Sequence, residues 1–151
     1  MKQPGEARPI AAVVGYAISV SGDQVLLIRK NRPPAQAGKL NGVGGKVEPG
    51  ERFIGAMVRE FREETGVETS ESDWTCFATL DSPGWNLAFF VARLPDDVLG
   101  RASSLTDETL EVCVIADLKQ ANTMRNLQWM IPFCLDASPY ELPVKLKELP
   151  Q

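Results

Sequence analysis

The feature that most constrains the fold is a proline-free stretch over residues 51–65, which directly follows a glycine-rich segment. Apolar residues recur in it at positions 54, 57, 58 and 61, the spacing of one face of an α-helix. Gly66 follows, and glycine commonly ends helices because it adopts the left-handed conformation. We therefore predict a helix over residues 51–65 that packs against a core through one face.

Glutamates crowd the same region, with seven between positions 48 and 71. At 100° per residue, Glu60, Glu63 and Glu64 fall within an arc of about 100°, apart from the arc that carries Ile54 and Phe61. Neighbouring exposed carboxylates repel one another, whereas a hard cation held among them reverses the sign of that interaction. On this ground alone two interpretations are open: a solvated acidic face, or a site for Mg²⁺ or Mn²⁺ with oxygen ligands only.

Two hairpins flank this helix in the sequence. Each consists of two runs rich in β-branched and apolar residues, separated by turn-forming residues. The predicted strand runs are 10–20 and 24–30 around Ser21-Gly22-Asp23, and 74–80 and 85–94 around Asp81-Ser82-Pro83-Gly84.

The remaining segments complete a single α/β domain over residues 1–151, with a mixed, largely antiparallel sheet. A further strand is predicted over 109–116, and Asn122 or Thr123 is predicted to cap a second helix that runs to Leu135. Polar or proline-rich composition predicts loops over 31–41, 42–50 and 95–107, and tails over 1–9 and 137–151.

Composition excludes several classes of function. A net charge of −4 and a pI near 4.9 argue against a nucleic-acid polymer as partner, because such a surface needs a basic face. The absence of histidine excludes Ser-His and Cys-His nucleophile pairs and histidine-containing zinc sites. The three cysteines are isolated and no apolar run reaches the roughly 20 residues of a membrane span, so we expect a cytoplasmic protein that acts on no membrane.

The spacing of glycine, glutamate and arginine across residues 45–67 is more specific than composition. Its fixed positions match by chance about once in 10⁸ starting points at average residue frequencies. The string resembles the signature box of Nudix hydrolases: Gly45, five residues, Glu51, seven residues, Arg59-Glu60-Phe61, one residue, Glu63-Glu64, one residue, Gly66-Val67. Phe61 stands where a bulky aliphatic residue is usual, for which we expect only local repacking.

The resemblance implies a Nudix-like α/β/α sandwich and the hydrolysis of a pyrophosphate linkage in a nucleoside diphosphate bonded to a further group X. Carried over to this chain, it implies that Glu60, Glu63 and Glu64 bind Mg²⁺ or Mn²⁺, with Glu60 and Glu64 also catalytic. The backbone carbonyl of Gly44 is a further expected ligand. Arg59 is expected to pair with Glu51 and to orient Glu60.

Other residues have a weaker claim to a role in the same site. Gly45 and Gly66 are expected to serve the geometry of the box, and Lys46 is either a phosphate contact or a solvated lysine. Glu108 matches a position where relatives place an extra glutamate that assists the base or binds metal, and Glu111 competes with it for that role. The alternative for either residue is a surface glutamate without a function.

The substrate is indicated by residues outside the box. The segment KLNGVGGK resembles the MutT-like enzymes that clear oxidised purine nucleotides, in which an asparagine at the position of Asn41 contacts the base. Pro83, 16 residues after Val67, is a placement associated with ADP-ribose hydrolases, but Pro83-Gly84 is also ordinary turn chemistry. Trp129 or Trp85 is a candidate to stack on the base.

We therefore expect a small-molecule nucleotide as partner, a nucleoside triphosphate cleaved to the monophosphate and pyrophosphate. The alternatives are an ADP-ribose or nucleotide-sugar pyrophosphatase and a Nudix-like module that binds a nucleotide without cleaving it. Monomer and homodimer both remain open.

Overall fold

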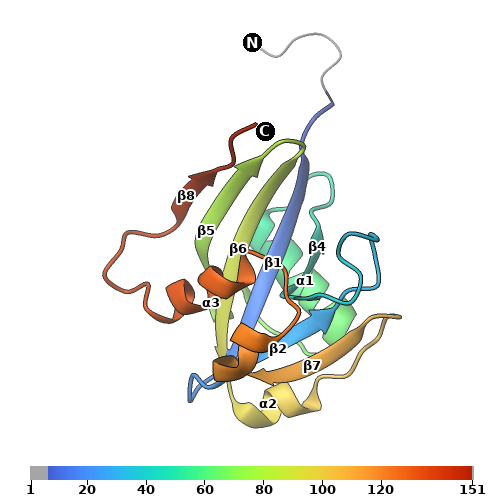
Figure 1. The fold of residues 1–151 in the computed structure, drawn as a ribbon, viewed down its shortest axis with the longest axis vertical. Helices are drawn as coiled ribbons and strands as arrows, with labels where there is room; N and C mark the ends of the chain where they lie inside the picture. The colour runs from blue at the N-terminus through green and yellow to red at the C-terminus, as the bar shows by residue number, and fades with distance from the viewer. Residues whose placement is uncertain (1–6, 151) are drawn as a thin grey trace.

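A mixed sheet with helices on both faces makes up the part of the chain that the computed structural model describes, residues 7–150 (Figure 1). This confirms the predicted α/β sandwich. The helices are α1 (Phe53–Thr65), α2 (Asp96–Arg101) and α3 (Leu127–Leu135), with 3₁₀ turns η1 (Glu71–Asp73) and η2 (Ile115–Gln120). The strands are β1 (Ile10–Ser19), β2 (Gln24–Arg29), β3 (Leu40–Asn41), β4 (Val43–Lys46), β5 (Trp74–Ser82), β6 (Trp85–Leu94), β7 (Thr109–Val114) and β8 (Val144–Lys147).

β1 is the central strand, and the sheet runs in the order β3-β2-β1-β6-β5-β8. β1 pairs in parallel with β6 along its whole length, from Ile10 opposite Trp85 to Ser19 opposite Leu94. Its other edge is shared by two antiparallel neighbours, because residues 12–15 pair with β4 whereas residues 17 and 18 pair with β2. Both predicted hairpins, β1–β2 and β5–β6, are confirmed.

The two faces of the sheet carry separate cores. On one face, α1 packs Ala56, Met57 and Phe61 against β1, β5 and β6, with all three side chains fully buried. Phe61 lies edge-to-face with Trp74 at a centroid distance of 5.1 Å. The phenylalanine that stands in place of the usual aliphatic residue of the box is therefore accommodated by packing against one neighbouring ring. On the other face, α3 packs against side chains of the same strands through Leu127, Met130, Ile131 and Cys134.

Helix α1 begins two residues later than predicted, at Phe53, and ends as predicted. Gly66 adopts a φ of 73°, and its N–H donates to the carbonyl of Arg62 at 2.9 Å. The preceding turn also follows its sequence, since Gly50 has a φ of 77° and the N–H of Glu51 donates to the carbonyl of Glu48.

The glycine segment before this turn was predicted as a loop, and that prediction is wrong for residues 43–46. They form β4, in which Gly44 lies opposite Val14 and Gly45 opposite Val13 of β1. A Cβ on Gly44 would collide with the backbone carbonyl of Val13. Here glycine permits close approach of two strands, which composition cannot distinguish from a turn.

Three further predictions need correction. The loop over 95–107 contains α2, which starts after Pro95 with Asp96 and Asp97 in its first turn, where carboxylates favour a helix. α3 starts at Leu127 rather than after Asn122 or Thr123, because the backbone of 122–124 instead bonds to Leu40 of β3. The expected tail over 137–151 contains β8, which extends the sheet beside β5. Within residues 7–150, no helix is both long and apolar enough to cross a membrane.

Candidate active site

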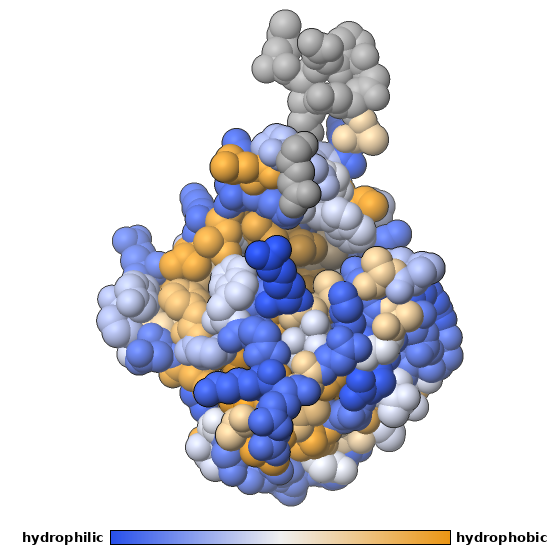
Figure 2. All heavy atoms as spheres, in the orientation of Figure 1, coloured by the Kyte–Doolittle hydropathy of each residue, from blue (hydrophilic) through white to orange (hydrophobic). Residues whose placement is uncertain are grey.

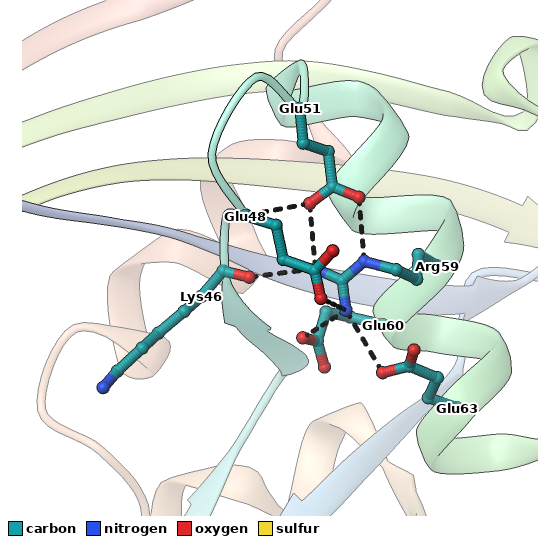
Figure 3. A network of polar contacts seen from close by, with 6 residues as sticks. All are labelled: Lys46, Glu48, Glu51, Arg59, Glu60 and Glu63. Atoms are coloured by element: carbon teal, nitrogen blue, oxygen red, sulfur yellow. Dashed lines mark hydrogen bonds and ion pairs between the residues drawn. The ribbon is translucent and has the colours of Figure 1, made fainter.

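Arg59 lies at the centre of the polar network in Figure 3. Its Nε and Nη2 donate to the two carboxylate oxygens of Glu51 at 2.8 and 2.9 Å, and Nη2 also donates to the backbone carbonyl of Lys46 at 3.0 Å. Glu51 in turn accepts the backbone N–H of Glu48 at 3.0 Å. This bidentate fork ties the end of β4 and the following turn to the middle of α1, and it is the pairing that the sequence predicted.

The fork keeps both partners ionised. Hydrogen bonds from Arg59 lower the pKa of Glu51 to about 2, and the same bonds raise the pKa of Arg59 above its ordinary value. Only 16% and 18% of the two side chains is exposed, so solvent screens the pair weakly. Glu51 and Arg59 are therefore a fixed structural pair with no proton to exchange near neutral pH.

The remaining nitrogen of Arg59 faces the other box carboxylates. Nη1 donates to Glu60 at 2.9 Å and to Glu63 at 3.1 Å. The Glu60 side chain is 14% exposed and that of Glu63 is 52% exposed. Burial raises the pKa of Glu60, and the bond from Arg59 opposes that rise. A Cβ on Gly45 would lie 2.5 Å from the Glu60 carboxyl carbon, so glycine is needed for this carboxylate to rest against β4.

Glu64 differs from these residues because its charge is not balanced. Its Oε2 is buried and has no hydrogen-bond partner within residues 7–150. Burial, and next the charge of Glu60, raise the pKa of Glu64 to about 7, although the charge of Lys30 acts in the opposite direction. This carboxyl group can therefore both accept and release a proton near neutral pH.

Glu108 lies close enough to Glu64 for its charge to raise that pKa as well. It is only 7% exposed, and it accepts from Lys30 Nζ at 3.0 Å and from the backbone N–H of Asn31 at 2.5 Å. The competing candidate, Glu111, is instead bound by Arg29 through two contacts of 2.5 and 2.9 Å. Of the two, only Glu108 is placed beside the box carboxylates.

A cavity of about 410 Å³ opens along one edge of this cluster, which is within the usual range for small-molecule sites. Glu64, Gly44, Gly45 and Lys46 line it at the β4–α1 end. The rest of the wall comes from strands β1, β2, β3, β5 and β6, the segments between them, the segment before α3 and the C-terminal segment: Ala12, Val13, Val14, Ile28, Lys30, Pro33, Gln36, Asn41, Gly42, Leu80, Ser82, Trp85, Leu87, Phe89, Met124, Asn126 and Glu148.

Of the predicted substrate contacts, Asn41 and Lys46 lie in this wall, and Trp129 does not. Asn41 Oδ1 accepts the N–H of Gly42 at 2.8 Å, while its Nδ2 has no acceptor within the described chain. Trp129 points away from the sheet and is 49% exposed, since Leu127, Met130 and Ile131 take the buried face of α3. Trp85, the other tryptophan considered, lines the cavity and is 40% exposed.

Two cavity residues, Lys30 and Asn126, were missed by the sequence interpretation. Lys30 ends the β2 run and carries no motif. Asn126 directly precedes α3, and its Oδ1 is buried without a partner within residues 7–150. Asparagine at the start of a helix was a usable signal, but the helix start was placed three or four residues too early.

The box oxygens suit a hard divalent cation, since they are carboxylates and backbone carbonyls and one buried oxygen of Glu64 lacks a partner. Within residues 7–150, no three acidic or cysteine side chains converge as a closed set of ligands. Arg59 holds Glu60 and Glu63 instead. A cation would therefore share these two carboxylates with the guanidinium or displace it from them.

Comparisons with known proteins agree with this arrangement. A "CTP pyrophosphohydrolase" of Escherichia coli strain K12 is 33% identical over 84 residues, which are 56% of this chain and 62% of the relative. A "Putative 8-oxo-dGTP diphosphatase 2" of Mycobacterium tuberculosis is 44% identical over 59 residues, which are 39% of this chain and 41% of the relative. The alignments thus span less than two thirds of either relative.

Solved structures share the fold. A structure described as MutT from Aliivibrio salmonicida and Vibrio cholerae has a TM-score of 0.69 at 24% identity, covering 87% of this chain and 99% of the other. The NUDIX domain of Shewanella oneidensis NrtR, complexed with ADP ribose, has a TM-score of 0.75 at 15% identity, covering 91% and 94%. The family model described as NUDIX domain matches residues 8–133. With the box, the sandwich and this match over most of its length, the chain belongs to the NUDIX domain family.

Proposed function

We propose that this chain hydrolyses a phosphoanhydride bond of a nucleoside triphosphate, releasing the monophosphate and pyrophosphate. The observation that carries the proposal is that one cavity joins the unbalanced Glu64 carboxylate to the Asn41 amide. One end of the cavity offers carboxylates of raised pKa for proton transfer. The other end offers hydrogen-bonding groups for the nucleobase of the substrate.

At the β4–α1 end, Glu60, Glu63, Glu64 and the Gly44 carbonyl would hold a divalent cation, Mg²⁺ or Mn²⁺. The bound cation supplies neutralisation of phosphate oxygens and makes water a stronger acid. Glu64, whose buried Oε2 has no partner within residues 7–150, would accept the proton of the attacking water. Arg59 orients Glu60 through Nη1, and the Glu51 fork holds Arg59 in place.

Along the cavity, Lys46 and Lys30 offset phosphate charge, and Glu108 keeps Lys30 at the wall. Asn41 lies three residues before Gly44 and presents its free Nδ2 to the base. Trp85 and Leu87, at alternate positions of β6, supply apolar side chains to the wall, and the buried Phe89 lies on the same face of the strand.

The test is product analysis over a panel of nucleotides with millimolar Mg²⁺ and with EDTA. We expect equal amounts of monophosphate and pyrophosphate from the best triphosphate, and no turnover in EDTA. AMP and ribose 5-phosphate from ADP-ribose as the fastest reaction would favour the alternative that the Pro83 placement indicated. Tight nucleotide binding without turnover of any compound would identify a non-catalytic module.

Asn41→Ala tests the base end separately. Removing one hydrogen-bond partner in a buried site costs about 1–3 kcal/mol, so KM for the best base should rise roughly ten- to a hundredfold. Other bases should be affected less. An equal loss for every nucleotide would show that Asn41 supports the loop and does not read the base.

A further inference from the structure

The C-terminal strand β8 lies outside the stretch that the family model matches, which ends at residue 133. β8 pairs in parallel with β5, from Ala78 opposite Val144 to Asp81 opposite Lys147. The next residue, Glu148, is held by its own N–H, which donates to the carbonyl of Asp81 at 2.8 Å. The backbone position of Glu148 is therefore set by the sheet and not by a free tail.

The register places three side chains in one row across the end of the sheet. Ser82 lies opposite Trp85 on β6, and Glu148 follows the residue paired with Asp81, so the row is Trp85, Ser82 and Glu148. Alternation along the strands puts this row on the face of Leu80, Leu87 and Leu146, which pack toward the α3 core. All three side chains of the row belong to residues that line the cavity of Glu64.

This end of the cavity combines an apolar surface with an exposed carboxylate, that of Glu148. Trp85 is 40% exposed, and the upper left of Figure 2 shows apolar surface over the part of the sheet that carries β5, β6 and β8. Glu148 makes no ion pair within residues 7–150. Lys145 and Lys147 cannot neutralise it from β8, because alternation points them to the opposite face.

The chemistry of the row selects a ligand. An ionised carboxylate only accepts hydrogen bonds, so Glu148 is suited to N–H donors and repels carbonyl oxygens. Carboxylates read the amino group of cytosine in this way in nucleic-acid recognition. The buried Oδ1 of Asn126, in the same cavity, likewise lacks a donor. A flat ring with an exocyclic amino group on its edge offers N–H donors to these acceptors and covers Trp85.

We propose that Glu148, delivered by β8, is a specificity-determining residue that selects nucleobases bearing an exocyclic amino group. This inference rests on the proposed function, because it identifies the base end of the same site.

The experiment compares bases that differ at one edge: cytidine with uridine, guanosine with inosine, and adenosine with inosine. kcat/KM is measured for the triphosphates, and Kd is measured by calorimetry for the monophosphates, which lack the scissile bond. In the wild type we expect at least one amino-bearing member to be preferred over its partner by about tenfold in both measurements. Glu148→Gln should reduce that preference to within about twofold.

Glu141→Gln is the matched control, since Glu141 is an exposed glutamate of the same C-terminal segment and does not line the cavity. It should keep the wild-type preference. An unchanged preference in Glu148→Gln, or no preference for any amino-bearing base in the wild type, would overturn the inference. Failure to hydrolyse every triphosphate would contradict the proposed function instead, and the monophosphate titrations would still decide the role of Glu148.

Discussion

The two ends of the carboxylate cluster formed by α1 and the turn before it are built from the same residue type and differ in how their charges are satisfied. At one end, both oxygens of Glu51 accept from Arg59, and the pKa of Glu51 falls to about 2. At the other end, Glu64 keeps a buried oxygen without a partner within residues 7–150, and its pKa rises to about 7. The difference separates a pair that holds the shape of the site from a group able to perform chemistry in it.

Glu60 contributes to both ends, because it accepts from Arg59 and its charge raises the pKa of Glu64. A change at Glu60 is therefore expected to have the largest effect. Glu60→Gln keeps the shape of the side chain and removes a charge beside Glu64, and we expect kcat to fall by about 10³-fold or more while the fold persists. Steady-state kinetics and a thermal melt measure the two effects. Glu68→Gln, an exposed glutamate after the helix, is the control. Near-wild-type turnover would remove Glu60 from the mechanism.

Arg59→Ala tests the structural end. It leaves Glu51, Glu60 and Glu63 without their common partner, and we expect a loss of about 3–5 kcal/mol in the free energy of unfolding. Arg59→Lys should recover only part of this loss of stability, because the ammonium group of lysine cannot form the two-pronged contact with Glu51. Arg52→Ala, which breaks the exposed pair with Glu71, should cost about 0–1 kcal/mol. Equal urea midpoints for the Arg59 and Arg52 variants would contradict this assignment.

Glu108 and Glu111 also differ in their surroundings, and the expected difference between their variants in kcat is smaller than the effect of Glu60→Gln. Glu108→Gln should lower kcat by about 10–100-fold, because Glu108 lies beside Glu64 and binds Lys30 at the cavity wall. Glu111→Gln should leave kcat within about twofold and affect only stability, since Glu111 is engaged by Arg29. Parallel kinetics on the two variants measure this, and equal losses of kcat would leave no reason to place Glu108 in the site.

A pH-dependent effect on stability sharpens the assignment of Glu64. A pKa raised from 4.5 to about 7 means that the folded state holds the proton more tightly, so charged Glu64 lowers stability as pH rises through that window. Without divalent cation, Glu64→Gln should therefore melt several degrees above the wild type at pH 8, a gain of up to about 3 kcal/mol, and at the same temperature near pH 4. A difference independent of pH would refute the shifted pKa.

Millimolar Mg²⁺ supplies a second measurement on the same pair of proteins. It should raise the melting temperature of the wild type more than that of Glu64→Gln, because cation binding to the folded state relieves the unbalanced charge.

The sequence predicted those parts of the molecule that depend on local pattern. The period of apolar residues located α1, and Gly66 marked the end of that helix. The β-branched runs around Gly22 and Gly84 located both hairpins. The resemblance of the box to the Nudix signature implied that Arg59 pairs with Glu51, and the structure contains that pair.

What failed depends on contacts between distant segments. The strand at Gly44 exists because β1 approaches it closely, and the backbone of Thr123 pairs with β3 and so delays α3. Asn126, just before this later start, lines the cavity, and Trp129 does not. The burial of Glu108 likewise needs Lys30 and Asn31, more than 70 positions away, and no local pattern carries that information.

The pairing of strand β4 with β1 affects how often the backbone of the site opens to solvent. Because Gly44 and Gly45 are paired with the central strand, their backbone should open to solvent only in rare excursions, as core strands do, and not with the frequency of a glycine loop. Amide hydrogen exchange across residues 43–46 should therefore be slow in the absence of any ligand. A backbone that is already ordered loses little entropy when a polyphosphate binds, so we expect such a ligand to bind at this end of the cavity without further ordering of residues 43–46.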